Sequence, residues 1–273
     1  MATKLDHLNV GCGSKTHPAW VNIDMASNDP DVITANLLEG FPFPEARFDV
    51  VYHSQVLEHF PKDRALPFIR ECHRVLRPGG LIRVVVPDLA NIVSAYQHWL
   101  NACLAAPTEE ARANHEWMTI ELLDQMVRDR TGGAMGDYLA RPTLANEAFV
   151  LERVGASGRK FRDQLVAKAS RTTSAPAPAA GPGLRQRLLG LLGAERPDPE
   201  VVRVGRFRKG GEVHLWMYDR FSLAELLRKA GFVDMTVRDP FNSAVPDWSS
   251  FGLDVKDGVP YDPTSLFMEA RKP

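Results

Sequence analysis

The chain has 273 residues, of which 44% are hydrophobic and 25% charged, and its formal net charge is -1. This length allows one large α/β domain with a substantial insertion. The near-neutral charge creates no global field that would attract nucleic acid, so we expect no nucleic-acid partner. No apolar run reaches the roughly 18 residues of a membrane span, and no signal-peptide pattern opens the chain. Three scattered cysteines are typical of a reducing compartment, which predicts a cytoplasmic protein.

The first ninety residues alternate between strand-like and helix-like segments. Leu66–Leu76 has helical spacing and is followed by the helix-stopping Pro78-Gly79-Gly80. Alternation of this kind predicts a Rossmann-like, doubly wound, mostly parallel sheet. The strand candidates are Leu8–Val10, Val21–Asp24, Phe48–Tyr52 and Leu81–Val86.

The same pattern returns near the end of the chain. Ser222 is predicted to cap a helix, with Glu225 completing a capping box and Gly231 ending the helix. Val233–Val237 and Leu266–Ala270 are the predicted closing strands.

Between these two parts the pattern changes to helical stretches. A segment that enters after the carboxyl end of a strand lies above the ligand crevice of an α/β sheet. We therefore expect residues 91–213 to form a helical insertion, a lid or substrate site, on a core made of residues 1–90 and 214–273. Residues 172–183 are rich in Ala, Pro, Ser and Thr, which predicts a flexible linker. The helical stretches are Ile92–Leu104, Glu109–Asp129 and Leu144–Ser170, with a Gly-rich break at Thr131–Gly136.

A glycine turn follows the first strand. Gly11 and Gly13 allow a sharp bend and a close ligand approach, although many such turns bind dinucleotides or nothing at all. A dinucleotide fingerprint needs a third glycine where Thr16 stands. Asp24 ends the next strand and could accept both hydroxyls of a ribose. It follows Gly11 by only 13 residues instead of roughly 20, so the helix between them must be very short.

Several short motifs follow one another in a fixed order. They are Asn9–Gly13, Asp24, Ala35–Leu37, Phe41–Phe43, Phe48–Val51, Val56–His59 and Val75–Gly80. In this order they resemble the class I S-adenosylmethionine-dependent methyltransferases, and most of all the type 11 methyltransferase-domain group, over residues 5–90 and 214–240. The segment His214–Asp219 resembles a branch that often accompanies cell-surface glycan biosynthesis.

The resemblance implies a seven-stranded sheet with an antiparallel last strand, and S-adenosylmethionine as the cofactor. Asp24 would hold the ribose, Asn36 the adenine edge with Leu37 against the ring, and His53 would border the methionine end. Many relatives carry an acid at Asn9 and Asp at Asn36, but an amide can still bind adenine. The implied cofactor residues are Asn9, Gly11, Cys12, Gly13, Asp24, Asn36, Leu37, His53 and Ser54.

Methyl transfer to a hydroxyl requires a general base, and histidine suits that role near neutral pH. The candidates are His53, His59 and His214. His59 could instead orient its loop, and His53 could contribute only its backbone. In the sequence no Cys and His residues have metal-ligand spacing, so no metal is predicted.

Three residues are candidates for the acceptor site. Asp88 follows the fifth strand, where ligands bind, and equally suits a helix N-cap. Trp216 and Tyr218 could stack on a sugar or another ring, or pack in the core. We expect O-methylation of a small-molecule or glycan-type acceptor. The alternatives are a cofactor-binding protein without activity and, least favoured, a nicotinamide-dependent oxidoreductase.

The insertion is basic. Residues 150–212 hold 13 Lys and Arg against 6 Asp and Glu. This excess is either a solubilising face or an attraction for phosphate groups and anionic lipid. Leu184–Leu192 is short, apolar and basic. This pattern suits a weak, reversible contact with a membrane surface, and equally well packing on the lid. The oligomeric state stays open.

Overall fold

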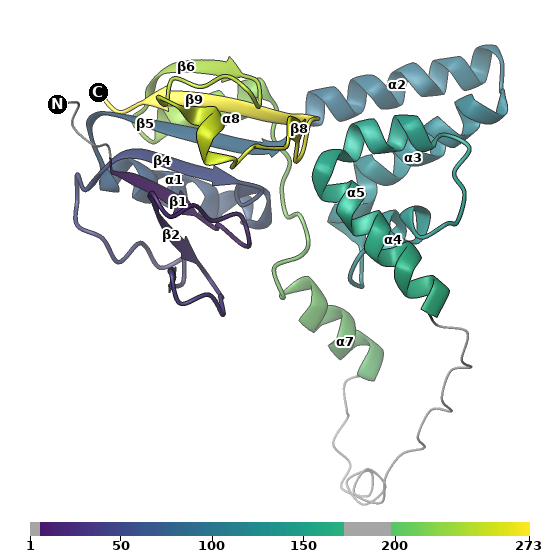
Figure 1. The fold of residues 1–273 in the computed structure, drawn as a ribbon, viewed down its shortest axis with the longest axis horizontal. Coiled ribbons are helices and arrows are strands. Elements are labelled where there is room, and N and C mark those ends of the chain that lie inside the picture. The colour runs from purple at the N-terminus through teal and green to yellow at the C-terminus, as the bar shows by residue number, and fades with distance from the viewer. Residues whose placement is uncertain (1–5, 172–197) are drawn as a thin grey trace, which may run out of the picture.

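The computed structural model describes residues 6–171 and 198–273, and a seven-stranded sheet forms its centre (Figure 1). Its strands are β1 (His7–Val10), β2 (Trp20–Asp24), β3 (Val32–Thr34), β4 (Phe48–Ser54), β5 (Leu76–Pro87), β6 (Val233–Arg238) and β9 (Ser265–Arg271). Their order is β3-β2-β1-β4-β5-β9-β6, with β1 to β5 parallel and β9 antiparallel to both neighbours. The predicted fold, including its antiparallel last strand, is confirmed.

Two helices cover one face of this sheet. α1 (Lys62–Val75) connects β4 to β5, and α8 (Arg220–Lys229) precedes β6. Their apolar faces, Phe68 and Ile69 on α1 and Leu223 and Leu227 on α8, join one core with alternate residues of the strands. Burial of these side chains supplies the driving force that fixes the strands in register.

The other face is covered without a long helix. The turn residues 11–19 connect β1 to β2 directly, so the short helix expected before Asp24 does not form. The 3-10 helix η3 (Trp248–Phe251) packs there instead, where Trp248 joins Trp20 and Tyr52 in a second apolar cluster. A late segment of the chain thus takes the place of the missing crossover helices.

A buried arginine fixes that late segment to the sheet. Arg83 on β5 is fully buried, and its guanidinium forms ion pairs with Asp254 at 2.7 Å and Glu269 at 2.9 Å. It also donates to the backbone carbonyls of Asp239 and Asn242. A charge removed from water must be paired in this way, since an unpaired one is strongly destabilising.

The helical region lies between β5 and α8 in the chain and beside the sheet in space (Figure 1). Its helices pack around their own core, in which Trp117, Met118 and Tyr138 are buried. Stretches predicted as helical are helical, but α4 begins inside the predicted Gly-rich break, after Gly132 with φ +79°. The helix α7, capped by Asp198, was not predicted. The helices are α2 (Leu89–Ala105), α3 (Glu109–Val127), α4 (Gly133–Leu139), α5 (Glu147–Arg171) and α7 (Pro199–Arg208).

The helix α5 bends at Gly155, where φ is +57°. A Cβ atom at this position would lie 2.3 Å from Cδ of Pro263, so only glycine permits the close approach. The bend brings α5 against the small hairpin of β7 (Val255–Lys256) and β8 (Val259–Pro260), and Ser157 N donates to the Tyr261 carbonyl at 3.1 Å. The hairpin therefore connects the helical region to the sheet.

The cap of α8 differs from the prediction. Asp219, not Ser222, is the N-cap: its carboxylate accepts from the backbone N–H groups of Phe221 and Ser222. Ser222 occupies the third helical position and its hydroxyl accepts from Asp219 N at 3.0 Å. Glu225 pairs with Arg228 instead of closing the box. The capping box thus exists, three residues earlier than predicted.

The chain leaves the sheet and returns to it at one point. Asp88 and Tyr218 form an isolated parallel bridge, and Leu89 N donates to the Tyr218 carbonyl at 2.9 Å.

The division into a core and a helical insertion at 91–213 stays a prediction, and the predicted linker and the segment Leu184–Leu192 lie outside the described residues. Among the helices in the described ranges, none combines the length and apolar character needed to cross a membrane.

Candidate active site

The glycine turn after β1 has the conformation that its sequence requires. Gly11 and Gly13 have φ values of +64° and +51°. A Cβ atom on Gly11 would lie 2.4 Å from Cγ2 of Val56, whereas one on Gly13 would meet nothing within 4 Å. Gly11 N donates to the Ile23 carbonyl at 2.8 Å, which holds the turn against β2. The turn therefore presents its exposed backbone beside open space at Gly13.

Asp24, at the end of β2, lies directly on this turn. Its Oδ2 atom accepts from Gly13 N at 2.7 Å, and Oδ1 accepts from Ala26 N at 3.3 Å. The predicted ribose acid and the predicted methionine loop are therefore in contact. The two sequence motifs therefore adjoin at the carboxyl ends of β1 and β2.

Two other predicted cofactor residues act from behind the turn. The Asn9 amide is buried and donates to the Lys15 carbonyl at 2.8 Å and to Asn22 Oδ1 at 3.1 Å. The Cys12 side chain is also buried; burial, with a contribution from the charge of Asp24, raises the pKa of its thiol to about 11. Asn9 thus braces the turn. The Cys12 backbone does the same, because its N–H donates to the Ile23 carbonyl at 3.3 Å and its carbonyl accepts from Lys15 N at 2.8 Å.

Asn36 and Leu37 follow β3. Leu37 is buried in the main core, so its side chain packs there and not against a ligand. Asn36 is exposed on the wall of an open hollow, where its amide donates to Glu39 Oε1 at 2.8 Å and accepts from Leu38 N at 3.1 Å. To bind an adenine edge, the Asn36 amide would have to give up its hydrogen bond to Glu39.

His53 lies in the core instead of at the site. Alternation along β4 turns its side chain toward α1, where the imidazole is 5.2 Å from the ring of Phe68. Burial lowers its pKa to about 3, and neither ring nitrogen has a partner in the described part of the chain. This placement removes His53 as a proton acceptor. Ser54, the next residue, ends β4 beside Lys15 and Asp262.

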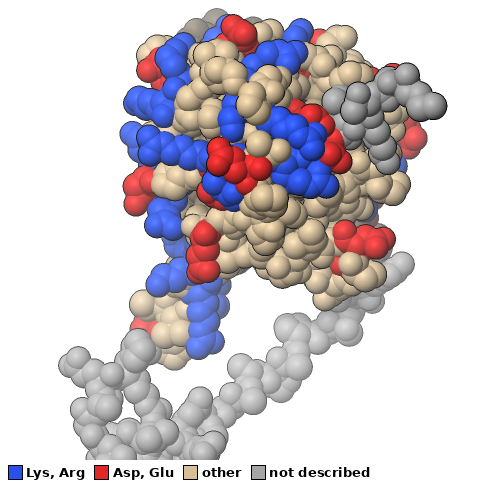
Figure 2. Space-filling view, turned by 90° about the vertical axis from the view of Figure 1, so that its left-hand side faces the viewer, with Lys and Arg blue, Asp and Glu red and all other residues tan. Residues whose placement is uncertain are grey.

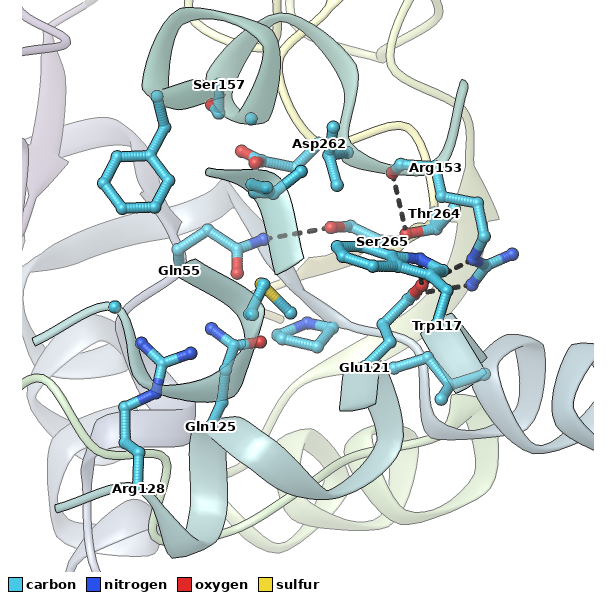
Figure 3. A pocket seen from close by; sticks show the side chains of 18 of the residues that line it. Gln55, Trp117, Glu121, Gln125, Arg128, Arg153, Ser157, Asp262, Thr264 and Ser265 are labelled. Carbon is cyan, nitrogen blue, oxygen red and sulfur yellow. Dashed lines mark hydrogen bonds and ion pairs between the residues drawn. The ribbon is translucent and has the colours of Figure 1, made fainter. Parts of the chain in front are cut away.

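A cavity of about 430 Å³ lies between the sheet edge and the helical region (Figure 3). Gln55 and Ser265, hydrogen-bonded at 2.9 Å, come from the ends of β4 and β9, and Trp117 and Phe161 come from α3 and α5. Gln55 has φ +56°, an unfavourable conformation for a residue with a side chain. Strain of this kind is typical of ligand-binding positions, and the sequence analysis missed Gln55.

The polar wall of the cavity is formed by paired charges. Glu121 on α3 accepts from the Arg153 guanidinium at 2.6 Å and from Trp117 Nε1 at 2.8 Å. Arg128 pairs with Asp124 at 2.5 Å and Glu212 at 3.1 Å. The pairs Glu121–Arg153 and Arg128–Glu212 join residues far apart in the chain, so no sequence motif indicated them. Arg128 and Asp124 are only four residues apart.

Next to this wall, three ionisable side chains converge. Glu58 and His59 belong to the 3-10 helix η1 (Leu57–His59) after β4, and His214 lies where the chain returns from the helical region. The rings of His59 and His214 are 4.8 Å apart between centroids, and His59 Nε2 lies 4.0 Å from Glu58 Oε1. Burial raises the pKa of Glu58 to about 8 and lowers that of His214 to about 3. Two of the predicted histidines therefore meet, and they meet at a carboxylate.

This cluster is a set of potential metal ligands that sequence spacing did not indicate. One ligand atom from each of Glu58, His59 and His214 lies within 4.8 Å of the others. Sequence spacing could not reveal it, because the fold brings His214 to η1 from the far end of the helical region.

The three predicted acceptor residues lie outside the lining of the cavity. Asp88 caps α2, with Oδ1 accepting from Ala90 N at 3.0 Å, as in the alternative interpretation. Tyr218 is buried, and burial raises the pKa of its hydroxyl, which has no partner among the residues described. Trp216 is half-buried, with Lys62 Nζ 4.2 Å from its ring centroid. Asp88 therefore lies where the chain enters the helical region, and Trp216 and Tyr218 lie where it returns to the sheet.

Charges of both signs cover the face in Figure 2, with Lys and Arg more frequent along one side and Asp and Glu among them. Several basic side chains of the segment 150–212 are paired: Arg153 with Glu121, Arg162 with Glu147, and Arg203 with Glu200. Such pairs favour the interpretation of this basic excess as part of the folded surface. Its attraction for phosphate or lipid stays a prediction.

Comparison with known proteins shows sequence similarity to methyltransferases. Residues 15–84, which contain β2 to most of β5, match the family model described as a methyltransferase domain. A probable S-adenosylmethionine-dependent methyltransferase of Mycobacterium tuberculosis is 50% identical over 58 residues, covering 21% of this chain and 20% of that protein. A protein of the same description from Mycolicibacterium smegmatis is 48% identical over 58 residues, covering 21% of each chain. The matched segment thus spans about a fifth of these relatives.

Solved structures with overall similarity include two methyltransferases. One, from Thermotoga maritima, is described as a possible histamine N-methyltransferase, with a TM-score of 0.39 at 10% identity, covering 100% of this chain and 84% of that one. The other, from Mesorhizobium loti, has a TM-score of 0.38 at 14% identity, covering 98% of this chain and 91% of that one.

Proposed function

We propose that this protein is a methyltransferase that binds its cofactor along the carboxyl ends of β1, β2 and β4 and its acceptor in the adjoining cavity. The cofactor is S-adenosylmethionine, which supplies a methyl group on a sulfonium. The observation that carries the proposal is the contact of the Asp24 carboxylate with Gly13 N at 2.7 Å. It joins a ribose-binding acid and a close-approach glycine turn at the edge where parallel sheets bind ligands.

The same edge is poorly suited to a nicotinamide dinucleotide. A pyrophosphate is held at the N-terminus of the helix that follows a glycine loop. Here residues 11–19 form turns and lead straight into β2. Thr16 also stands in place of the third glycine of that fingerprint. We therefore favour S-adenosylmethionine over a dinucleotide.

The cavity suits a small polar acceptor with a ring. Its size, about 430 Å³, falls in the range of small-molecule sites. Aromatic walls (Trp117 and Phe161) combine with hydrogen-bonding groups (Gln55, Glu121 and Ser265), which is the mixture that binds a sugar or a hydroxylated ring. We propose O-methylation of such a small-molecule or glycan-type acceptor.

Calorimetric titration of the purified chain tests the cofactor assignment. We expect micromolar binding of S-adenosylmethionine and S-adenosylhomocysteine, and none of NADH. Incubation with hydroxylated sugars and phenols, followed by mass spectrometry, then detects methyl transfer. Binding of NADH alone would contradict the proposal. Tight binding of S-adenosylmethionine without transfer to any acceptor would favour a cofactor-binding protein without activity.

A further inference from the structure

We propose that Glu58, His59 and His214 bind a divalent transition-metal ion beside the acceptor cavity. The three side chains come from two distant parts of the chain, η1 after β4 and the segment that returns to the sheet. One ligand atom from each lies within 4.8 Å of the other two. The site is independent of the glycine turn after β1 and of Asp24 at the end of β2.

Glu58 gives the strongest indication of a cation site. Its side chain is fully buried, and neither carboxylate oxygen has a hydrogen-bond partner within the described ranges. Buried polar groups are almost always hydrogen-bonded, because leaving a carboxylate unpaired away from water costs several kcal/mol. A bound cation would satisfy both oxygens at once.

His59 is oriented as metal ligands usually are. Its Nδ1 atom lies 3.2 Å from the Val213 carbonyl, so Nδ1–H donates to that oxygen. The lone pair of Nε2 then faces Glu58 Oε1, 4.0 Å away. A backbone carbonyl that fixes the tautomer of a ligating histidine is the common second contact in metal sites.

One ring nitrogen of His214 also has a hydrogen-bond partner, which in this case is a side chain and not a backbone carbonyl. Its Nε2 atom lies 3.1 Å from the amide of Gln125, a residue that lines the cavity. A half-turn of an amide exchanges its oxygen and nitrogen, so the Gln125 oxygen can accept from Nε2–H. Nδ1 of His214, buried and without a partner in the part of the chain described, is then left as a donor to a metal.

The donor set selects the class of ion. Two imidazoles and one carboxylate suit zinc and other first-row transition metals, whereas calcium and magnesium prefer oxygen ligands. Bonds of about 2.0–2.1 Å in a tetrahedral site hold the ligand atoms about 3.3–3.4 Å apart, so side chains now within 4.8 Å of one another would close by at most about 1.5 Å. Three protein ligands leave at least one coordination position open.

The ion would connect η1, which follows β4, to the helical region. It would join η1 to the returning segment and, through Gln125, to the α3 wall of the cavity. A Lewis acid in this place could polarise an acceptor hydroxyl that reaches the open position. Only this last role rests on the proposed methyl transfer; metal binding itself does not.

The test is metal titration of the full chain after treatment with a chelator. Zn²⁺ binding is measured by calorimetry against a competing chelator, and Co²⁺ binding by its visible absorption, which reports the ligand geometry. The variants are Glu58→Gln and His59→Asn, with His98→Asn as the matched control, because His98 is exposed and lies outside the cluster. We expect one tight equivalent in the wild type and in His98→Asn, weakened at least about tenfold in the other two variants.

Thermal unfolding separates loss of the site from loss of the fold. At the same concentration, Zn²⁺ should raise the Tm of the wild type by more than it raises that of Glu58→Gln. Absence of a stoichiometric Zn²⁺ equivalent, or equal affinity in all variants, would overturn the inference. S-adenosylmethionine titration of the same samples keeps the two proposals apart: cofactor binding without metal binding refutes only the metal site, and metal binding without cofactor binding refutes only the methyltransferase proposal.

Discussion

The carboxylate of Asp24 has two tasks at the edge of the sheet, since it holds the Gly13 backbone and leaves acceptor capacity for a ligand. Asp24→Ala should weaken S-adenosylmethionine binding by about 1–3 kcal/mol, through the loss of hydrogen bonds to a charged group. Calorimetry measures the change, with Asp29→Ala as the control, because Asp29 is an exposed acid of the following loop. Unchanged affinity in Asp24→Ala would show that the ribose binds elsewhere.

Gly11 and Gly13 lie in one turn but meet different surroundings. Gly11→Ala should lower the free energy of unfolding by about 2–4 kcal/mol, because it combines left-handed backbone strain with a contact to Val56 that a Cβ atom would make at 2.4 Å. Gly13→Ala should cost only the strain, about 1–2 kcal/mol. Urea unfolding of both variants measures the difference. Equal losses would contradict the role of Val56.

At the scale of residues, the sequence was most informative where binding groups lie close together along the chain. Gly13 and Asp24 meet because one turn joins neighbouring strands. The resemblance placed His53 at the methionine end of the cofactor. In the structure His53 lies within β4, and its ring is buried against Phe68. Glu121 and Arg153 could not be predicted, since their contact depends on how two helices of the insertion pack.

At the scale of elements, α8 depends on its first turn. Asp219→Ala should destabilise the protein by about 0.5–2 kcal/mol through loss of the N-cap. Backbone hydrogen bonds, chiefly from Ser222, hold the pKa of Asp219 below its usual value. The stabilisation is therefore present above the unfolded-state pKa and is lost as the pH falls through the lowered folded-state pKa.

Urea unfolding at neutral and at acid pH tests this cap. The difference between wild type and Asp219→Ala should be largest near neutrality and should shrink on acidification. The control is Asp31→Ala, because Asp31 is exposed, lies in the loop before β3 and caps no helix. A difference that stays constant over this pH range would contradict the capping role of the Asp219 carboxylate.

Strands and amphipathic helices were predictable because period-two and period-3.6 patterns reflect which face is buried. β1, β2, β4, β6 and β9 were found within about two residues of their predicted bounds, whereas β5 begins at Leu76, five residues earlier than predicted. β3, with one buried residue, had too weak a pattern. The α8 start was misplaced because Asp219 and Ser222 both have good capping side chains.

At the scale of the whole molecule, Arg83 joins the sheet to the late segment that covers its second face. Arg83→Leu should lower the free energy of unfolding by about 3–5 kcal/mol, because Asp254 and Glu269 would remain buried without their partner. Guanidinium unfolding measures the loss, and Arg271→Leu, on the exposed end of β9, is the control. A loss no larger than that of the control would contradict the role of the buried pair.

How the helical region packs could not be predicted from sequence. Its helices were indicated, yet the approach of α5 to the β8 hairpin requires the bend at Gly155, and this glycine has no neighbouring motif. The cavity exists only because that approach and the return of the chain at His214 occur together. Contacts of this range are decided by packing, not by local pattern.

The pairing of Asp88 with Tyr218 has a consequence for how such proteins diversify. Because the two ends of the helical excursion already adjoin, replacing or lengthening it would leave the register of β5 against β9 untouched. The entropy of closing such a loop grows only slowly with its length. Under the proposed function, exchange of the helical region would change the acceptor cavity, while the strand order of the sheet stayed the same.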